Sequence, residues 1–368
     1  MLRVMIGDDS PGYAGALRRV LESDGDIEVV AICASAQQAI AKLASGGSGG
    51  SPPRPPERAV DLLAIDIGLP GMNGLEAIEE IMSSRPLPVL VLMPNAAGTG
   101  DAAAAVLAAG ALEAIGRDEV NLADPAGASG VALRNRVRLL AKARVIRHPR
   151  ARLRPSRRLP GRGRRVSAIG FCASTGGPKI LGTVLAALPA SYPIPLLVVQ
   201  HISPGFTAGL VRWLNLTADM PVRVASDGAA AGNGAWIAPE GANLKLGHTG
   251  RLELDWLPTE EHHLPSGDVL LSSIAASAGR AGVAVVLTGM GKDGARGAAA
   301  VRLAGGLAIA QDEESSAVYG MPRAAAETGV DLVLSPAEII SYLRGLSYQP
   351  LAGEPAAAEG RPDGRGRP

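Results

Sequence analysis

The sequence predicts two α/β domains, each a doubly wound parallel sheet with helices on both faces. Apolar runs of strand length alternate along most of the chain with segments of helical spacing, which is the pattern of successive βαβ units. The chain has 368 residues, too many for one ordinary core, so two domains of roughly 150 to 200 residues are expected. Hydrophobic residues make up 47% of the chain but aromatic residues only 3%, so aliphatic side chains must fill the core, as in layered α/β folds.

The first domain is expected to span residues 1–145. Apolar runs predict its parallel strands at 2–6, 27–33, 62–67, 89–93 and 111–115. Helical spacing predicts helices at 14–22, 36–43 and 75–83, an alanine-rich helix before the fifth strand, and a last helix at 131–145. Residues 46–58, GGSGGSPPRPPER, lack the hydrophobicity to fold and are interpreted as a flexible surface insertion.

The second domain is expected at residues 166–347, after an Arg- and Pro-rich linker at 146–165. Its predicted parallel strands are 166–173, 196–199, 283–287, 307–310 and 332–334. Between residues 235 and 256, the alternation in LKLGHTGRLEL predicts an antiparallel hairpin added to the sheet. Residues 348–368 are rich in Ala, Gly, Pro and Arg and are expected to be a disordered tail.

The charge distribution and the cysteine content indicate which cellular environment and which partners to expect. The net charge is +1, but residues 134–165 contain thirteen Arg, one Lys and no acid. We interpret the linker within it, residues 146–165, as a solvated tether. The alternative is a contact with nucleic acid or an anionic surface, but a basic run without interleaved aromatic residues is weak evidence for it, so no nucleic-acid partner is expected. Cys33 and Cys172 fall in different domains, so no disulfide framework is expected and a reducing cytoplasm is the simpler setting. No apolar run reaches transmembrane length, so neither export nor membrane insertion is expected.

Three acidic residues lie at predicted strand ends in the first domain. Asp8 and Asp9 follow the first strand, and Asp66 lies near the end of the third. Functional residues of parallel sheets collect at this carboxyl edge. Three carboxylates there would repel one another without a hard cation, and oxygen ligands of this kind favour Mg²⁺, beside which a carboxylate can accept a phosphoryl group. The alternative is that these acids are solvated loop residues.

Ser174, His201 and Asp293 each follow a different predicted strand of the second domain. Together they are a nucleophile, a base and a carboxylate delivered to one crevice, which is what a catalytic triad requires. The glycine-rich turn STGGP after the first of these strands would aim backbone N–H groups at a bound oxyanion. Such turns also bind phosphates, and the G-x-S-x-G spacing of many serine hydrolases is absent, so a phosphate-binding protein is an alternative. The lack of a Walker-type Lys-Ser/Thr pair weakens that alternative.

GDDS and DLLAIDIGLPGMNGLEAI, over roughly residues 1 to 120, resemble the signatures of bacterial response-regulator receivers. The resemblance implies a flavodoxin-like fold, Asp66 as phosphoacceptor and Asp8 and Asp9 as Mg²⁺ ligands. Two positions depart from that family: Met93 replaces the Ser or Thr that ends the fourth strand, and Arg117-Asp118 replaces Lys-Pro. Because a thioether cannot donate and Arg has a different shape from Lys, we expect phosphorylation-driven switching to be impaired or to work differently.

ASTGGP, QHISPGFT, IAPEG, PSGDVL, LTGMGKDGARG and YGMPRAA occur in order and resemble the catalytic domain of chemotaxis protein-glutamate methylesterases. The resemblance implies Ser174 as nucleophile, His201 as general base and acid, and Asp293 as the group that orients His201, with no cofactor. Backbone N–H groups near Thr175, and Met290, are candidates for lining the oxyanion site.

The resemblance also implies the substrate and partners. These are glutamate γ-methyl esters on cytoplasmic chemoreceptor helices, with glutamine deamidation in some relatives, and a chemotaxis histidine kinase as phosphodonor. Cys172 stands where relatives usually have glycine and Leu264 where they often have Arg; residues 260–263, EEHH, are not expected to bind metal because adjacent side chains diverge. The competing hypothesis is a non-enzymatic regulator whose receiver keeps the crevice covered.

Overall fold

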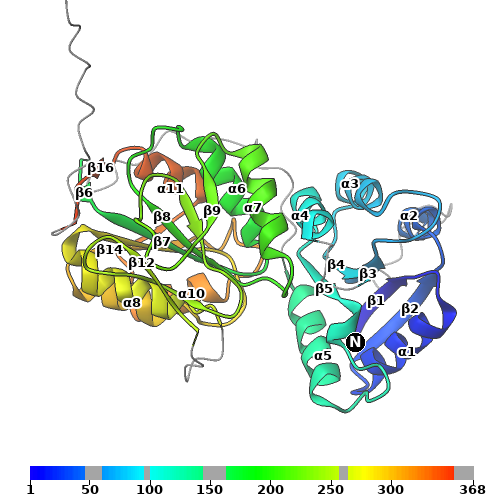
Figure 1. The fold of residues 1–368 in the computed structure, drawn as a ribbon. Helices are drawn as coiled ribbons and strands as arrows, with labels where there is room; N and C mark the ends of the chain where they lie inside the picture. Colours follow the sequence, from blue (N-terminus) through cyan, green and yellow to red (C-terminus); the bar gives the residue numbers. More distant parts are fainter. Residues whose placement is uncertain (46–59, 95–99, 144–162, 257–263, 352–368) are drawn as a thin grey trace, which may run out of the picture.

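The computed structural model describes residues 1–45, 60–94, 100–143, 163–256 and 264–351. Two α/β bodies lie side by side, the N-terminal one ending at α5 and the C-terminal one running from β6 to β16 (Figure 1). The predicted insertion at 46–58, the predicted linker up to residue 162, and the predicted tail from residue 352 lie outside the described residues.

The N-terminal body contains a five-stranded parallel sheet in the order β2-β1-β3-β4-β5. Its strands are β1 (Leu2–Gly7), β2 (Ile27–Cys33), β3 (Leu62–Asp66), β4 (Val89–Met93) and β5 (Glu113–Gly116). Its helices are α1 (Pro11–Glu22), α2 (Ala36–Ser45), α3 (Gly74–Ser84), α4 (Gly100–Ala109), the 3₁₀ turn η1 (Arg117–Glu119) and α5 (Ala128–Leu140). Both β3 and β4 are buried along their whole length, as expected of strands covered on both faces. The order leaves β5 at one edge of the sheet.

The C-terminal body contains a seven-stranded parallel sheet in the order β15-β14-β13-β7-β8-β10-β9. Its strands are β7 (Ala168–Ala173), β8 (Leu196–Gln200), β9 (Val222–Val224), β10 (Ala235–Ile237), β13 (Gly282–Val286), β14 (Leu307–Gln311) and β15 (Leu332–Leu334). One core cluster lies under α6 (Gly177–Ala187), α7 (Thr207–Thr217) and α11 (Pro336–Leu343). The other lies under α8 (Gly267–Ala278), α9 (Ala295–Leu303) and α10 (Met321–Thr328), with the 3₁₀ turn η2 (Gly279–Ala281) following α8. The predicted α/β class is confirmed for both bodies.

The predicted hairpin exists, but it does not extend the main sheet. Strands β11 (Asn243–Leu246) and β12 (Leu252–Asp255) pair antiparallel only with each other. They lie against α8 instead, where Leu246 N–H donates to Ser273 Oγ at 2.9 Å and Ser277 Oγ donates to Leu246 O at 2.5 Å. Strands β9 and β10, which alternation does not reveal because each has three residues, fill the sheet edge in its place.

The ordered chain also continues past the expected end at residue 347. Strand β16 (Ser347–Tyr348) pairs in parallel with β6 (Arg165–Val166), and Leu351 is buried against one core cluster. Residues 348–351 are therefore part of the second body rather than of a disordered tail.

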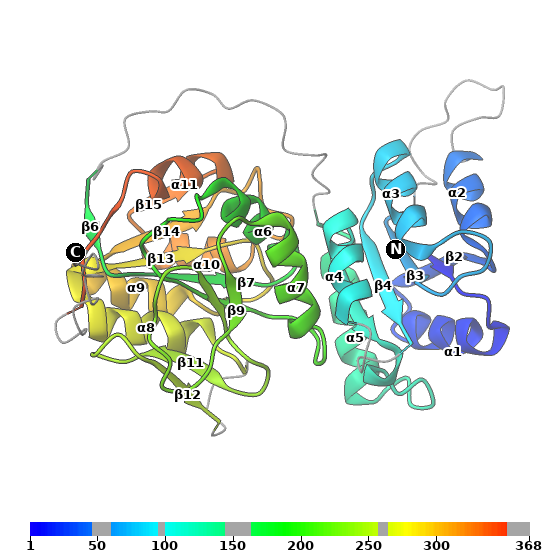
Figure 2. The same cartoon turned by 45° about the horizontal axis from the view of Figure 1, so that its top comes forward.

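The two bodies meet through α4 and α7, which lie side by side in both ribbon views (Figures 1 and 2). The helices touch backbone to backbone, because a Cβ placed on Gly209 would lie 1.9 Å from the carbonyl oxygen of Gly100. Phe206, which precedes α7, is fully buried in a core cluster of the N-terminal body. An exposed ion pair between Asp101 and Arg212 borders this contact. The interface thus combines an apolar anchor with close helix packing.

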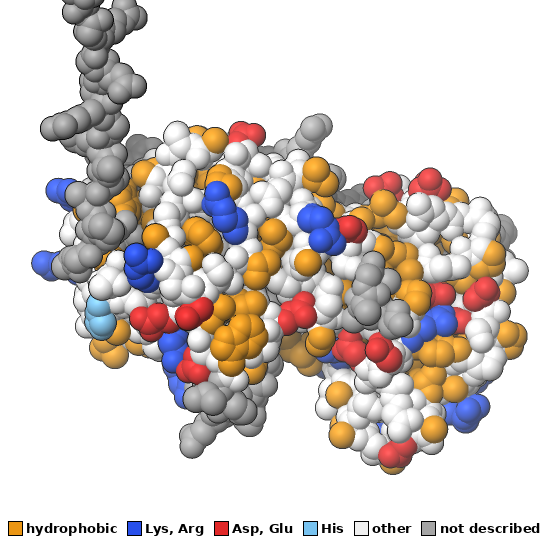
Figure 3. All heavy atoms as spheres, viewed as in Figure 1, with side chains coloured by type: hydrophobic (Ala, Val, Ile, Leu, Met, Phe, Trp, Pro, Cys, Tyr) orange, Lys and Arg blue, Asp and Glu red, His pale blue; other side chains and the backbone are white. Residues whose placement is uncertain are grey.

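On the face shown in Figure 3, acidic and basic side chains are interspersed over both bodies, in keeping with the net charge of +1. Among the described residues, no helix combines the length and the hydrophobicity needed to cross a bilayer.

Candidate active site

Ser174 and His201 leave neighbouring strands at the same edge of the C-terminal sheet. Strands β7 and β8 pair in parallel up to Ala173 and Gln200, and His201 N–H then donates to Ala173 O at 2.9 Å. Ser174 N–H donates to Thr288 O at 3.0 Å, which ties the same point to the loop after β13. Ser174 and His201 are therefore neighbours at two adjacent strand ends.

A tight turn after Ser174 directs the start of α6 toward it. Gly176 has φ of 76°, a left-handed conformation that glycine adopts without strain, and Gly177 N–H donates back to Ser174 O at 2.8 Å. The Gln200 side chain donates to Ser174 O at 2.9 Å and to His201 O at 2.8 Å. This glutamine, which the sequence alone does not single out, links the two strand ends.

Asp293 is held at the N-terminus of α8. Its Oδ1 accepts hydrogen bonds from Ser266 Oγ at 3.0 Å, Asp268 N–H at 2.9 Å and Gly294 N–H at 3.0 Å. Its Oδ2 accepts from Gly267 N–H at 2.6 Å and lies 2.8 Å from His201 Nε2. A helix N-terminus has free N–H groups and favours a carboxylate. Here these N–H groups and the Ser266 hydroxyl hold both oxygens of Asp293 in place.

The environment of Asp293 keeps it ionised. Burial alone would raise the pKa of this carboxyl, but the hydrogen bond and charge of His201 and the backbone N–H groups of Gly267 and Asp268 lower the pKa to about 2. A carboxylate that stays charged and immobile beside an imidazole holds the ring in one orientation.

The serine is approached closely by the loop that follows β13. A Cβ on Gly289 would lie 2.7 Å from Ser174 Cβ and 2.3 Å from Met321 Sδ, so only glycine fits there. Met290 is the next residue and is half-buried, while Thr175 is 6% exposed and its carbonyl accepts from Thr288 Oγ1 at 3.0 Å. Of the two predicted lining residues, Thr175 therefore follows Ser174 directly in the chain, and Met290 follows the glycine that packs against Ser174.

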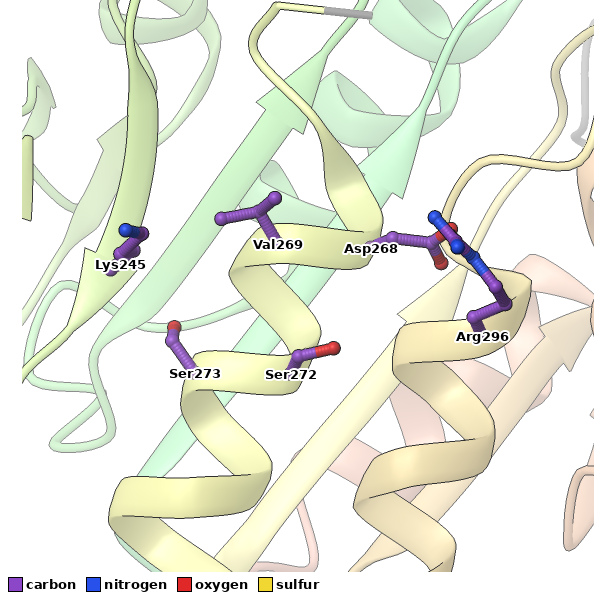
Figure 4. A pocket seen from close by; sticks show the side chains of 6 residues that line it. All are labelled: Lys245, Asp268, Val269, Ser272, Ser273 and Arg296. Carbon is purple, nitrogen blue, oxygen red and sulfur yellow. The ribbon is translucent and has the colours of Figure 1, made fainter. Parts of the chain in front are cut away.

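An open hollow of about 510 Å³ lies on the outer side of α8 (Figure 4). It is lined by Lys245, Asp268, Val269, Ser272, Ser273 and Arg296. Its cationic groups are paired: Arg296 Nε lies 2.9 Å from Asp268 Oδ2, and Lys245 Nζ lies 2.6 Å from Asp255 Oδ2. The hollow adjoins the triad only through Asp268, whose N–H holds Asp293.

In the N-terminal body the acidic residues do not meet as predicted. Asp8 and Asp66 lie together at the strand ends, but Arg117 Nη2 is 2.5 Å from Asp8 Oδ2 and 2.8 Å from Asp66 Oδ2. Asp9 is exposed, and the described residues contain no group of three acidic, His or Cys side chains arranged to hold a metal ion. The predicted Mg²⁺ site of Asp8, Asp9 and Asp66 therefore does not fit this pocket, because Arg117 Nη2 already contacts both buried carboxylates and Asp9 is exposed.

The two departures noted in the sequence both shape this pocket. Met93 is fully buried in the core at the end of β4 and offers no hydroxyl. The Tyr13 ring covers the guanidinium of Arg117, with 4.2 Å from Cζ to the ring centroid. Burial is the main cause that raises the pKa values of Asp8 and Asp66, and the charge of Arg117 opposes it in both.

Both cysteines are buried. Cys172 is fully buried, and a Cβ on Gly267 would lie 1.9 Å from its Sγ, so this thiol packs against the first turn of α8. Burial raises the pKa of the Cys172 thiol, which disfavours a reactive thiolate. Cys33 is also free and buried. Leu264 is 39% exposed, and residues 260–263 lie outside the described part of the chain.

Comparison with known proteins connects both bodies to characterised families. The CheB methylesterase family matches residues 169–343, and the response regulator receiver domain family matches residues 4–119. A protein-glutamate methylesterase/protein-glutamine glutaminase 3 of Myxococcus xanthus (strain DK1622) is 41% identical over 371 residues, covering 99% of this chain and 97% of the relative. A protein-glutamate methylesterase/protein-glutamine glutaminase 2 of Anaeromyxobacter dehalogenans (strain 2CP-C) is 39% identical over 350 residues, covering 94% and 97%. The crystal structure of the Thermotoga maritima CheB methylesterase catalytic domain is 37% identical, covers 48% of this chain and 97% of its own, and has a TM-score of 0.47.

Proposed function

Because this chain belongs to the family of CheB-type protein-glutamate methylesterases/protein-glutamine glutaminases, we propose that it hydrolyses glutamate γ-methyl esters on chemoreceptors and deamidates glutamine side chains there. Ester hydrolysis releases methanol and leaves glutamate; deamidation releases ammonia and leaves the same product. The methylated receptor helices would be cytoplasmic, so we expect the enzyme to act in the cytoplasm. The single observation that carries the chemistry is the contact of His201 Nε2 with Asp293 at 2.8 Å, beside Ser174 at the neighbouring strand end.

In the proposed reaction, Ser174 Oγ attacks the ester carbonyl carbon and gives its proton to His201. Asp293 holds the Nε2–H side of the ring, so Nδ1 is the nitrogen left to take the proton. Collapse of the tetrahedral intermediate expels methanol, which takes its proton from His201 and leaves an acyl-enzyme. Water then attacks the acyl-enzyme by the same steps and releases the glutamate carboxylate and Ser174.

Negative charge develops on the substrate carbonyl oxygen during both halves of this reaction. Backbone N–H groups near Thr175 at the start of α6, together with Met290 in the loop that packs on Ser174, are the groups we propose to line this oxyanion site. Fixed donors at a helix N-terminus need no reorganisation when the charge appears, which is why they favour the transition state.

We further propose that the receiver domain limits access to this site. The chain entering β5 lies against the catalytic edge, where Leu112 O accepts from Gly176 N–H at 3.4 Å and Ala114 O accepts from Ser203 Oγ at 3.2 Å. These donors are two residues beyond Ser174 and His201. A chemotaxis histidine kinase would be the phosphodonor to Asp66 if phosphorylation controls this contact, although Met93 and Arg117 alter the pocket that would receive the phosphoryl group.

The test is methanol release from a methylated receptor fragment by full-length enzyme. We expect activity in the wild-type protein and its loss, by about a thousandfold or more, in Ser174→Ala, because the remaining groups cannot form the acyl-enzyme. Thr183→Ala, in the helix α6 that follows Ser174 but away from the strand end, is the matched control and should retain activity. Equal methanol release by wild type and Ser174→Ala would overturn the proposed nucleophile.

A further inference from the structure

The acid pocket of the receiver already contains a cation that belongs to the chain. A single arginine nitrogen, Nη2 of Arg117, lies 2.5 Å from Asp8 and 2.8 Å from Asp66. The Asp8 side chain is fully buried, the Asp66 side chain is 8% exposed, and that of Arg117 is 22% exposed. Screening by water is therefore weak here, and the guanidinium neutralises charge that would otherwise be repulsive.

The position of Arg117 is fixed from several sides. Tyr13 stacks on the guanidinium, and Gly116 N–H donates to Glu119 Oε1 at 2.8 Å, which closes the η1 turn that carries the arginine. On the other side, Asp8 Oδ1 is occupied by Ser10 N–H at 2.9 Å. These contacts hold the arginine and one of its carboxylate partners, so the bridge does not depend on a mobile side chain.

A divalent metal that took Asp8 Oδ2 and Asp66 Oδ2 as ligands would have to displace the arginine. Mg²⁺ needs oxygen ligands at about 2.1 Å in an octahedral set that keeps several waters. Asp8 Oδ2 and Asp66 Oδ2 are the oxygens that contact Nη2. An arginine keeps its charge at every relevant pH, so it cannot leave by losing a proton.

We propose that the Arg117 guanidinium is the resident cation of this receiver, taking the place of a divalent metal between Asp8 and Asp66 and holding the domain in its docked form without Mg²⁺. Arg117 directly follows β5, and the carbonyls of Leu112 and Ala114 along that segment accept hydrogen bonds from the catalytic domain. The bridge thus fixes the strand that lies against the active site.

The experiment titrates metal-free, full-length protein with Mn²⁺ and follows free Mn²⁺ by electron paramagnetic resonance. Wild type and Asp66→Asn should bind Mn²⁺ equally weakly, because the wild-type pocket has no metal site to lose. Arg117→Ala should gain a site that Arg117→Ala/Asp66→Asn loses, with affinity about tenfold or more above the wild type, since two buried carboxylates are left without a cation. Arg18→Ala, which removes an exposed arginine paired with one carboxylate, that of Glu22, in the same domain, is the control and should behave as the wild type.

Thermal unfolding gives a second readout. Millimolar Mg²⁺ should leave the Tm of the wild type unchanged and raise that of Arg117→Ala. A wild-type Mn²⁺ site that Asp66→Asn removes, or an equal rise in Tm for wild type and Arg117→Ala, would overturn the proposal. If Arg117→Ala does not fold, the comparison of wild type with Asp66→Asn still decides it, because that pair needs no arginine variant.

Discussion

Replacing Asp293 by asparagine tests how the proposed base is oriented. In the native protein Oδ1 accepts three donors, and Oδ2 accepts Gly267 N–H and contacts His201 Nε2. An asparagine has one oxygen, which the three donors will take, so its NH₂ group faces Gly267 N–H and the imidazole. The amide can bond the ring only when Nε2 carries no proton. The proton then lies on Nδ1, and the ring cannot accept the proton of Ser174.

The wrong tautomer should reduce kcat by about 10⁴-fold, the size of the effect when the acid of a serine hydrolase triad becomes an amide. KM should change little, because Asp293 is 6% exposed and its oxygens are occupied by the start of α8, Gly294 and His201. The variant should also be less stable. The native pKa of about 2, against an ordinary value of 3.8, corresponds to about 2 kcal/mol of stability at neutral pH that the amide lacks.

The assay is methanol release at pH 7, with circular dichroism to establish that the variant is folded. Asp268→Asn is the matched control. Like Asp293→Asn it removes one carboxylate charge, here from the first turn of α8, but the Asp268 side chain bonds Arg296 and Gly297 rather than the base. We expect its kcat to stay within about tenfold of the wild type. A folded Asp293→Asn enzyme that retains kcat within the same range would refute the reasoning that Asp293 orients His201.

Three further outcomes follow from packing and charge. Gly289→Ala should lower kcat by about tenfold to a hundredfold, because the new methyl group would displace Ser174. It should also lower the free energy of unfolding by about 1–3 kcal/mol. A wild-type kcat in steady-state kinetics would contradict this. Gly209→Ala should force α7 away from Gly100 and raise the basal rate of methanol release, which an unchanged or lower rate in a folded variant would exclude. The stability that ionised Asp293 contributes should be complete above about pH 4 and should be lost as the pH falls through about 2. The measurement is the Tm of wild type and of Asp293→Asn as the pH is lowered, and the difference between the two Tm values should disappear at the acid end.

The positions of Ser174 and His201 could be predicted from the sequence because each follows a buried apolar run. In a parallel sheet such runs end at one edge, and the register of β7 with β8 then brings the two residues together without further information. Asp293 follows β13 through a longer loop, and its strand neighbours β7 rather than β8. Its contact with His201 depends on the conformation of that loop, which no periodicity encodes.

The support of Asp293 by α8 could not be read from the sequence. Ser266, Gly267 and Asp268 precede it by more than twenty residues, and the PSGD segment indicates only the start of a helix. That this helix start points at a carboxylate is a result of tertiary packing, in which Cys172 and Gly267 are in contact. The three-residue strands β9 and β10 were missed for a similar reason, since so short a segment shows no alternation.

In the receiver, the sequence identified the unusual residues but not their geometry. Asp8 and Asp66 lie at strand ends as predicted, and Arg117 and Met93 depart from the receiver pattern. The prediction of a metal site assumed that repulsion among the acids needs an external ion. In the structure Arg117 supplies the positive charge that these carboxylates need. The sequence alone cannot distinguish this arginine from a metal ion, because either would place positive charge at the same strand ends.

Strand β5 joins the acid pocket to the proposed active site. Its neighbouring carbonyl at Leu112 accepts from Gly176 N–H, at the turn that follows the nucleophile, and its far end leads into Arg117. A movement of β5 that releases Gly176 must therefore strain the bridge from Arg117 to Asp8 and Asp66. Because the arginine is part of the chain, we expect this resistance to be the same at every Mg²⁺ concentration. If the receiver limits access as proposed, the fraction of molecules with an open active site depends on packing at the domain interface. We therefore expect a change at the α4–α7 contact to alter the basal rate and added Mg²⁺ to leave it unchanged.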